Sequence, residues 1–202
     1  MIRGAGPTET KRERTRRALI EAGLKRFADR GVAATSLAEI VGDVGVTERT
    51  FYRYFASKEE ILFADYEDRI DWFRTALQVR PRSEPITMSV RYAVEAFPGD
   101  HRLVSEAARL RATELTEQQV AFHLQRVQAL LAQEIETHLR ATLCSEPGRA
   151  LRAAVVANVI AAAVFAAMTH WGRNHGADLD QLGPLVEEAL AIADRGVTDT
   201  LA

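Results

Sequence analysis

Residues 35–58 read TSLAEIVGDVGVTERTFYRYFASK and contain two short helical patterns separated by a glycine-containing turn. Ser36 and Glu39 fit a capping box, in which a hydroxyl and a carboxylate each accept a hydrogen bond from an otherwise unpaired backbone N–H. This pattern predicts a short helix that starts after Ser36 and ends near Asp43.

A tight turn follows this helix, and Gly45 occupies the position where a positive φ is needed. Thr47 is the predicted N-cap of a third short helix over residues 48–54. The apolar residues of this stretch are spaced to pack on the preceding helix; they are Ile40, Val41, Val46 and Phe51, facing Leu24 and Phe27. Two short helices that pack in this way on a longer one define a helix-turn-helix.

The chain on either side of this motif is also predicted to be helical. A long helix covers about residues 10–30, where apolar residues recur at helical spacing, and Gly31 ends it. On the C-terminal side, Ser57 and Glu60 fit a second capping box, which predicts a long helix to about Val79.

The rest of the chain lacks the alternating β-branched runs and hairpin turn signals that are typical of strands. Further helices are expected at residues 86–97, 100–114, 116–143, 149–173 and 178–199. We therefore predict an all-α protein of about nine helices. An N-terminal three-helix domain over residues 1–56 would carry the helix-turn-helix, and residues 57–202 would form a C-terminal helical domain.

The third helix of the motif is predicted to turn a polar face outward. Glu48, Arg49, Tyr52 and Arg53 share that face. A helix this short is not stable alone, and large exposed side chains on it indicate a binding surface. The major groove of DNA is wide enough to admit a helix, and an arginine there can contact guanine O6 and N7 together.

The motif resembles the DNA-binding signature of the tetracycline-repressor (TetR) family of transcriptional regulators. The resemblance covers about residues 12–62, and the matching positions are Thr35-Ser36, Ile40, Gly45-Val46-Thr47, Thr50-Phe51-Tyr52, Tyr54-Phe55 and Ser57-Lys58-Glu59. It implies a dimeric, ligand-responsive repressor that binds a palindromic operator in double-stranded DNA and is released by a small-molecule effector.

The resemblance also implies roles for single residues. Those expected to contact bases or adjacent phosphates are Glu48, Arg49, Thr50 and Arg53. Those expected to contact the DNA backbone are Thr35, Thr47, Tyr52, Tyr54 and Lys58. Arg49 stands where members often have glycine, which leaves the operator sequence unpredicted.

In the C-terminal domain, the resemblance implies that the last two helices pack against those of a second copy. Small residues that would let these helices approach closely are Ala153, Ala154, Ala157, Ala161 and Ala163. An apolar stripe on the final helix comprises Leu182, Leu185, Val186, Ala189, Leu190 and Ala193.

The resemblance further implies a central pocket for the effector, which we expect to be largely apolar. Candidate lining residues are Trp72, Phe73, Phe97, Phe122, Asn158, Phe165 and Thr169. The aromatic residues equally fit an ordinary core, and Asn158 equally fits a hydrogen bond within the core or the dimer seam. Arg69, Arg109 and Arg111 could meet an anionic ligand, although we expect these three side chains at the surface.

Charge is distributed unevenly along the chain. Residues 1–60 carry 12 Lys and Arg against 9 Asp and Glu, whereas the remainder carries 14 against 19. This asymmetry suggests that only the N-terminal part meets a polyanion. The basic run Lys11–Arg17 either reaches DNA or forms a solvated helix face.

Other classes of function find little support. The single Cys144 forms no intrachain disulfide, the five histidines fit no metal-ligand motif, and no nucleophile or phosphate-loop motif is present. We expect no enzyme activity, metal or cofactor. The apolar stretch Leu151–Met168 contains Arg152 and Asn158 and indicates a buried interface helix, so no membrane partner is expected.

The N-terminus shows no signal-peptide pattern, so we expect a cytoplasmic protein. Two alternatives to DNA-dependent regulation remain open. One is a helical interaction protein without DNA binding, and the other is an enzyme that uses the central cavity.

Overall fold

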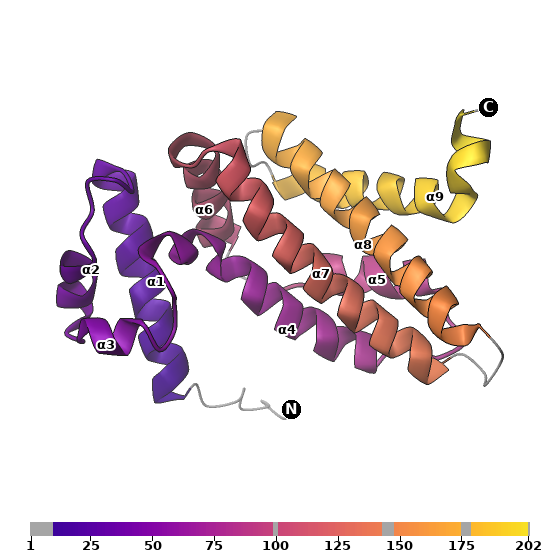
Figure 1. Cartoon of the computed structure of the whole chain (residues 1–202), viewed down its shortest axis with the longest axis horizontal. Helices are drawn as coiled ribbons and strands as arrows, with labels where there is room; N and C mark the ends of the chain where they lie inside the picture. The colour runs from indigo at the N-terminus through magenta and orange to yellow at the C-terminus, as the bar shows by residue number, and fades with distance from the viewer. Residues whose placement is uncertain (1–9, 99–100, 143–147, 175–178, 202) are drawn as a thin grey trace, which may run out of the picture. The chain divides into compact units, whose positions relative to one another are not determined.

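The computed structural model describes residues 10–98, 101–142, 148–174 and 179–201, and these form helices and turns without a β-strand. The all-α prediction is therefore confirmed for the described part of the chain. In chain order (Figure 1), the elements are α1 (Lys11–Arg30), α2 (Leu37–Val44), α3 (Glu48–Phe51), η1 (Lys58–Phe63), α4 (Ala64–Gln78), α5 (Ile86–Glu95), α6 (His101–Glu114), α7 (Glu117–Thr142), α8 (Arg149–Asn174), η2 (Leu179–Gln181) and α9 (Leu182–Leu201).

The elements group into two compact units, residues 1–64 and residues 65–202. The unit boundary lies beyond the predicted domain boundary at residue 56, because η1 packs on α1. At this contact, a Cβ added to Gly23 would lie 2.5 Å from the Cδ1 of Ile61. A glycine at residue 23 therefore lets the two helices approach closely.

Helix caps determine the local structure of the first unit. Ser36 and Glu39 form a reciprocal capping box at the start of α2, as predicted. Gly45 adopts the left-handed conformation, with φ 70°, and its N–H bonds to the carbonyls of Val41 and Gly42. The sequence thus specifies where α2 begins and where the chain turns toward α3.

The second predicted capping box is wrong. The Ser57 side chain makes no cap hydrogen bond, and Glu60 instead accepts one from the backbone N–H of Ala56 at 2.7 Å. The chain then forms the 3-10 helix η1 before α4 begins at Ala64. The third helix is also shorter than predicted: α3 ends at Phe51, and the next residues continue as a turn.

The core of the second unit is formed by side chains from α4, α5, α7, α8 and α9. The inner face of α8 consists of small residues, since Ala153, Ala157 and Ala161 are all fully buried. They let α8 pack closely against α7 and α9 of its own chain. The expectation that these three alanines face a second copy is therefore wrong.

The apolar stripe of α9 behaves in the same way. Leu182, Val186 and Leu190 are at most 8% exposed and belong to the core of their own chain. Leu185 and Ala189 are only partly buried and pack at the edge of this core. The whole stripe therefore cannot pack against a second copy, because Leu182, Val186 and Leu190 already pack in the core of their own chain.

α8 is also, among the described helices, the one long and apolar enough to cross a membrane. A core helix of a soluble protein meets the same criterion, and the inner face of α8 is packed against α7 and α9.

Among the described residues, no group of three His, Cys, Asp or Glu side chains could hold a metal ion. Cys144 and one of the five histidines, His175, lie outside these residues.

Candidate DNA-binding surface and interior cavity

The four residues of α3 separate into an inner and an outer side. Phe51 is fully buried and packs against Phe55, with ring centroids 5.3 Å apart. The next residue, Tyr52, is 57% exposed, and Glu48, Arg49 and Arg53 are exposed as well. Three of the four residues predicted to contact bases, Glu48, Arg49 and Arg53, are thus exposed, and Thr50 is half-buried. Phe51 and Phe55 anchor this segment on its inner side.

The start of α3 is fixed by two threonines. The Thr47 hydroxyl accepts a hydrogen bond from the Thr50 N–H at 3.2 Å, and the two hydroxyl oxygens lie 3.0 Å apart. The bond between the hydroxyls uses one of their two hydrogens. The other hydrogen remains available to an acceptor outside the protein, such as a phosphate oxygen.

Thr35 and Lys58 have internal partners, which corrects the expectation for Thr35. The Thr35 side chain is 1% exposed and donates to the carbonyl of Gly31 at 2.9 Å, so it is enclosed and satisfied. Lys58 donates through Nζ to the carbonyls of Val32 at 2.7 Å and Thr35 at 2.6 Å. An ammonium carries three hydrogens, so a phosphate contact by Lys58 stays a prediction beside this structural role.

Ion pairs between α1 and α2 neutralise the acidic residues of α2. Arg26 donates to Asp43 at 2.7 Å, and Arg30 donates to Glu39 at 2.6 Å. The pKa of Glu39 is lowered to about 2 by hydrogen bonds from the Ser36 backbone and from Arg30, and Arg26 lowers the pKa of Asp43. Both carboxylates stay ionised at neutral pH. The paired arginines balance their negative charge, which reduces the repulsion that a DNA phosphate would meet.

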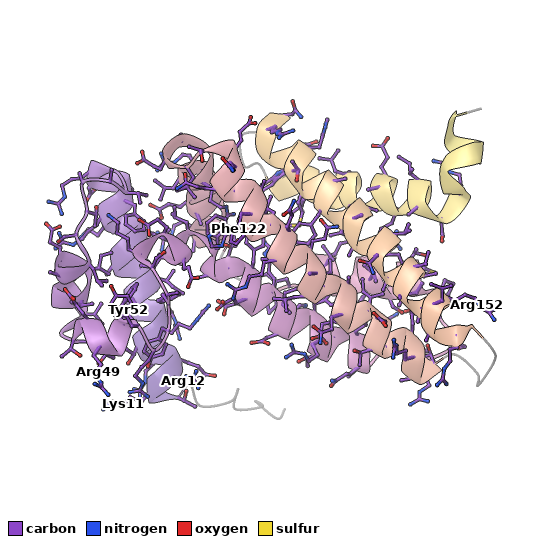
Figure 2. All side chains as sticks on the ribbon, viewed as in Figure 1. Lys11, Arg12, Arg49, Tyr52, Phe122 and Arg152 are labelled. Carbon is purple, nitrogen blue, oxygen red and sulfur yellow. The ribbon has the colours of Figure 1, made fainter. Side chains whose placement is uncertain are left out.

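The basic run at the start of α1 divides into two parts. Lys11, Arg12 and Arg14 are exposed. In the view of Figure 2, the labelled Lys11 and Arg12 lie at the same end of the first unit as Arg49 and Tyr52. The Arg16 guanidinium instead donates to the carbonyl of Ala64 at 3.1 Å and lies 5.7 Å from the ring centroid of Phe55.

Tyr54 is half-buried, with its ring 6.5 Å from that of Phe55. Its phenol is therefore less accessible than that of Tyr52. Its predicted contact with the DNA backbone stays a prediction.

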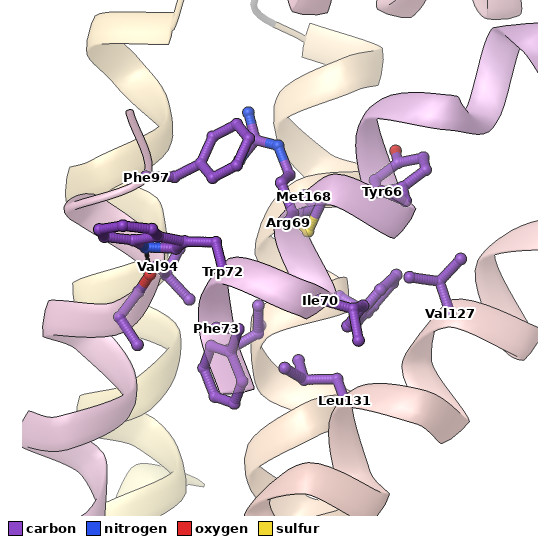
Figure 3. A pocket seen from close by; sticks show the side chains of 13 residues that line it. Tyr66, Arg69, Ile70, Trp72, Phe73, Val94, Phe97, Val127, Leu131 and Met168 are labelled. Carbon is purple, nitrogen blue, oxygen red and sulfur yellow. Dashed lines mark hydrogen bonds between the residues drawn. The ribbon is translucent and has the colours of Figure 1, made fainter. Parts of the chain in front are cut away.

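The second unit contains a cavity that is partly open to solvent. Its atom-free volume is about 440 Å³, which includes the solvent space at the opening. Four of the predicted lining residues border it: Trp72, Phe73, Phe97 and Phe165. The other described residues that line it are Tyr66, Arg69, Ile70, Ala93, Val94, Val127, Leu131, Val164 and Met168 (Figure 3). Most of these additional residues are aliphatic, and nothing in the sequence distinguishes them from ordinary core.

Three predicted lining residues do not border this cavity. Phe122 is 71% exposed on α7. Asn158 is exposed on the outer side of α8, and its amide donates to the carbonyl of Ala154 at 2.8 Å. The Thr169 hydroxyl likewise donates to the carbonyl of Phe165 in its own helix. The polar groups of both α8 residues are satisfied by the preceding helical turn, which removes the argument for a ligand contact.

Two arginines near this cavity differ from expectation. Arg111 is only 5% exposed and donates to Asp65 at 2.7 Å, so its predicted place at the surface is wrong. The guanidinium of Arg111 also lies over the ring of Tyr66, 4.7 Å from its centroid. Arg69 is partly buried and lines the cavity, whereas Arg109 is exposed as expected.

Comparisons with known proteins agree with the helix-turn-helix. The family model described as "Bacterial regulatory proteins, tetR family" matches residues 19–64. The HTH-type transcriptional regulator TcmR of Streptomyces glaucescens is 30% identical over 203 aligned positions, which cover 93% of this chain and 86% of TcmR. The HTH-type transcriptional repressor LfrR of Mycolicibacterium smegmatis is 34% identical over 86 positions, or 42% of this chain and 44% of LfrR.

Among solved structures, one assigned to the TetR family, from Mesorhizobium loti MAFF303099, is similar with a TM-score of 0.50 at 18% identity. The likeness covers 91% of this chain and 96% of that chain. At this level of identity it shows the fold alone.

Proposed function

Because the chain belongs to the TetR family of bacterial regulatory proteins, we propose that the outer face of α3 reads its operator and that a ligand in the interior cavity controls this binding. The chain is a DNA-binding transcriptional regulator and not an enzyme. One observation carries the proposal for α3: Phe51 is fully buried, whereas the adjacent Tyr52 is 57% exposed. The helix is thus held by one side and offers the other side to a groove.

The chemistry of the outer face suits the major groove. The guanidinium groups of Arg49 and Arg53 can each donate two parallel hydrogen bonds to guanine, and the Glu48 carboxylate can accept one from cytosine. The Tyr52 hydroxyl can donate to a phosphate, which positions the helix without reading sequence. Base preference would therefore come mainly from the charged residues of α3.

The outer face of α8 supports a dimer. Leu151, Val155 and Val159 are between 47% and 70% exposed, and Ala162 and Ala166 continue the same row at helical spacing. A row of aliphatic side chains on the surface of a single chain favours a second copy as its partner. Two-fold symmetry would present two α3 helices to half-sites about 34 Å apart, one turn of DNA.

The proposed action is repression that an effector relieves, in the cytoplasm, where bacterial DNA lies. A ligand changes operator affinity only if it binds one conformation of the regulator more tightly than another. The cavity is a suitable place for such a ligand, because its walls are largely apolar and Trp72 already satisfies its indole N–H on the carbonyl of Ala93, at 3.1 Å.

The test begins with selection of bound duplexes from a random library, followed by titration of the selected duplex. Arg49→Ala is expected to weaken binding by about 1–3 kcal/mol and to relax the preference at one base pair. Tyr52→Ala is expected to weaken binding by a similar factor on all duplexes. Arg109→Ala removes an exposed arginine from α6 and is expected to bind as the unmodified protein does.

The competing roles give different results. An interaction protein without DNA binding would select no duplex. If a duplex is selected but neither Arg49→Ala nor Tyr52→Ala changes its affinity, α3 is not the reading surface.

A further inference from the structure

The cavity of the second unit is lined by a partly buried arginine, one of whose N–H donors is enclosed. Among the described residues that line the cavity, Arg69 is the one with a formal charge. Its Nε is buried and has no hydrogen-bond partner among the described residues. Its guanidinium lies 4.8 Å from the ring centroid of Phe97. A ring face offsets part of the cost of burying a cation, but it leaves the N–H donor unsatisfied.

The nearby carboxylate does not fill this need, because it is engaged by another arginine. Asp65 accepts from both terminal nitrogens of Arg111, at 2.7 and 3.5 Å. Burial alone would lower the pKa of Arg111, but Asp65 and Tyr66 together raise it. The pKa of Arg69, by contrast, is lowered, chiefly by burial. Among the described residues, Asp65 thus forms an ion pair with Arg111, whereas its charge acts on Arg69 without an ion pair and does not offset the effect of burial.

The rest of the cavity shows what kind of molecule would supply that partner. In Figure 3, Arg69 and Phe97 lie at one end of the lining, and Phe73 and Leu131 lie at the other. Ile70, Val127 and the remaining aliphatic residues add no charge. A ligand that fits must therefore place an apolar body among the side chains and an acceptor at the guanidinium.

We propose that the cavity binds a small, mostly apolar carboxylate, with the anionic group on Arg69 and the ring or chain toward Phe73. This rests on the proposed function only in treating the cavity as the effector site. A guanidinium matches a carboxylate in shape and can donate two parallel hydrogen bonds to it. Binding would thus satisfy the buried Nε and provide the counter-charge that Asp65 gives to Arg111.

The experiment compares acids with neutral amides of the same shape. Phenylacetate, 1-naphthylacetate and octanoate are titrated at millimolar concentrations into the full chain by calorimetry, each beside its primary amide. We expect at least one acid to bind tenfold or more tightly than its amide. Arg69→Gln should remove this preference, whereas Arg69→Lys should retain part of it. Arg109→Gln, at an exposed arginine of α6, should behave as the unmodified protein does.

Three results would overturn the proposal. They are the binding of amides as tightly as acids, an acid affinity that Arg69→Gln leaves unchanged, and the absence of binding by every acid in the series. Correct folding of Arg69→Gln and Arg69→Lys is checked by thermal melting in the absence of ligand, and Arg69→Met is melted beside them. Its melting temperature should equal or exceed that of the unmodified chain, because the substitution removes a buried donor that has no partner.

Operator affinity of the unmodified chain, measured with and without each acid and amide, separates this proposal from the proposed function. If acids bind through Arg69 but do not change operator affinity, the ligand class stands and the regulatory role of the cavity fails. If operator affinity responds to neutral amides as strongly as to acids, the regulatory role stands and the ligand class fails.

Discussion

The outer faces of α3 and α8 both expose side chains that do not pack within the chain. Those at α3 are mostly charged or polar, whereas those on α8 are aliphatic. α3 and the turn after it expose Glu48, Arg49, Tyr52 and Arg53, which can donate to or accept from a polar partner. α8 exposes an aliphatic row that begins with Leu151, 70% exposed. The first face therefore suits a charged and hydrated partner, and the second suits a surface like itself.

The way each face is supported also differs. On its inner side, α3 is anchored by two packed aromatic rings, those of Phe51 and Phe55. The start of α3 is capped by the hydroxyl of Thr47. Behind the exposed row of α8 lie alanines packed into the core of the same chain. A short helix needs such anchors because it is not stable alone, whereas a 26-residue helix is held along its length by packing. The two faces can thus be perturbed separately.

The largest effect is expected from a charge in the α8 row. Val159→Asp should dissociate the dimer, because an unpaired carboxylate at the interface costs about 3 kcal/mol or more. Sedimentation would detect the monomer. Operator affinity should fall as well, because only one α3 helix would then be presented to each duplex.

The control for this variant is Val79→Asp, which places the same charge at a position that is 75% exposed after α4. It should remain dimeric and bind the operator normally. A Val159→Asp protein that stays dimeric would show that the α8 row is not the interface.

The second prediction separates the two faces by their response to salt. Operator affinity should fall at least about tenfold between 50 and 200 mM salt, because phosphate contacts release condensed counterions. Dimer affinity should not fall over this range, since the α8 row is aliphatic. Fluorescence anisotropy of labelled DNA and sedimentation of the free protein measure the two. A parallel loss of both affinities would contradict the contrast between the faces.

The sequence predicted α2 and the turn after it correctly because their signals are local. The Ser36–Glu39 cap lies within one helical turn, and Gly45 marks its own positive φ. The contacts of Lys58 with the carbonyls of Val32 and Thr35 span more than twenty residues and leave no local pattern. The sequence therefore predicted α2 and the turn correctly but not the internal role of Lys58.

The second unit was predicted less well, because α8 is nearly uniform in composition. Alanine and valine occur on all its sides, so periodicity identifies a helix but not the face that turns inward. Only the packing of α7 and α9 shows that Ala157 points inward and Val155 outward. Phe122 was misplaced for a related reason, since an aromatic residue in an apolar pattern is expected to be buried and this one is 71% exposed.

The smallest predicted effect concerns how firmly the outer face of α3 is held. Thr47→Ala removes the hydroxyl that accepts from the Thr50 N–H, and should destabilise α3 by about 1 kcal/mol. Amide hydrogen exchange in residues 48–52 should become faster by a corresponding factor, while exchange in α8 stays unchanged. Thr47→Ser keeps the hydroxyl and should exchange as the unmodified chain does. If the two variants exchange at the same rate, Phe51 and Phe55 hold α3 without help from its cap, and the outer face depends on aromatic packing alone.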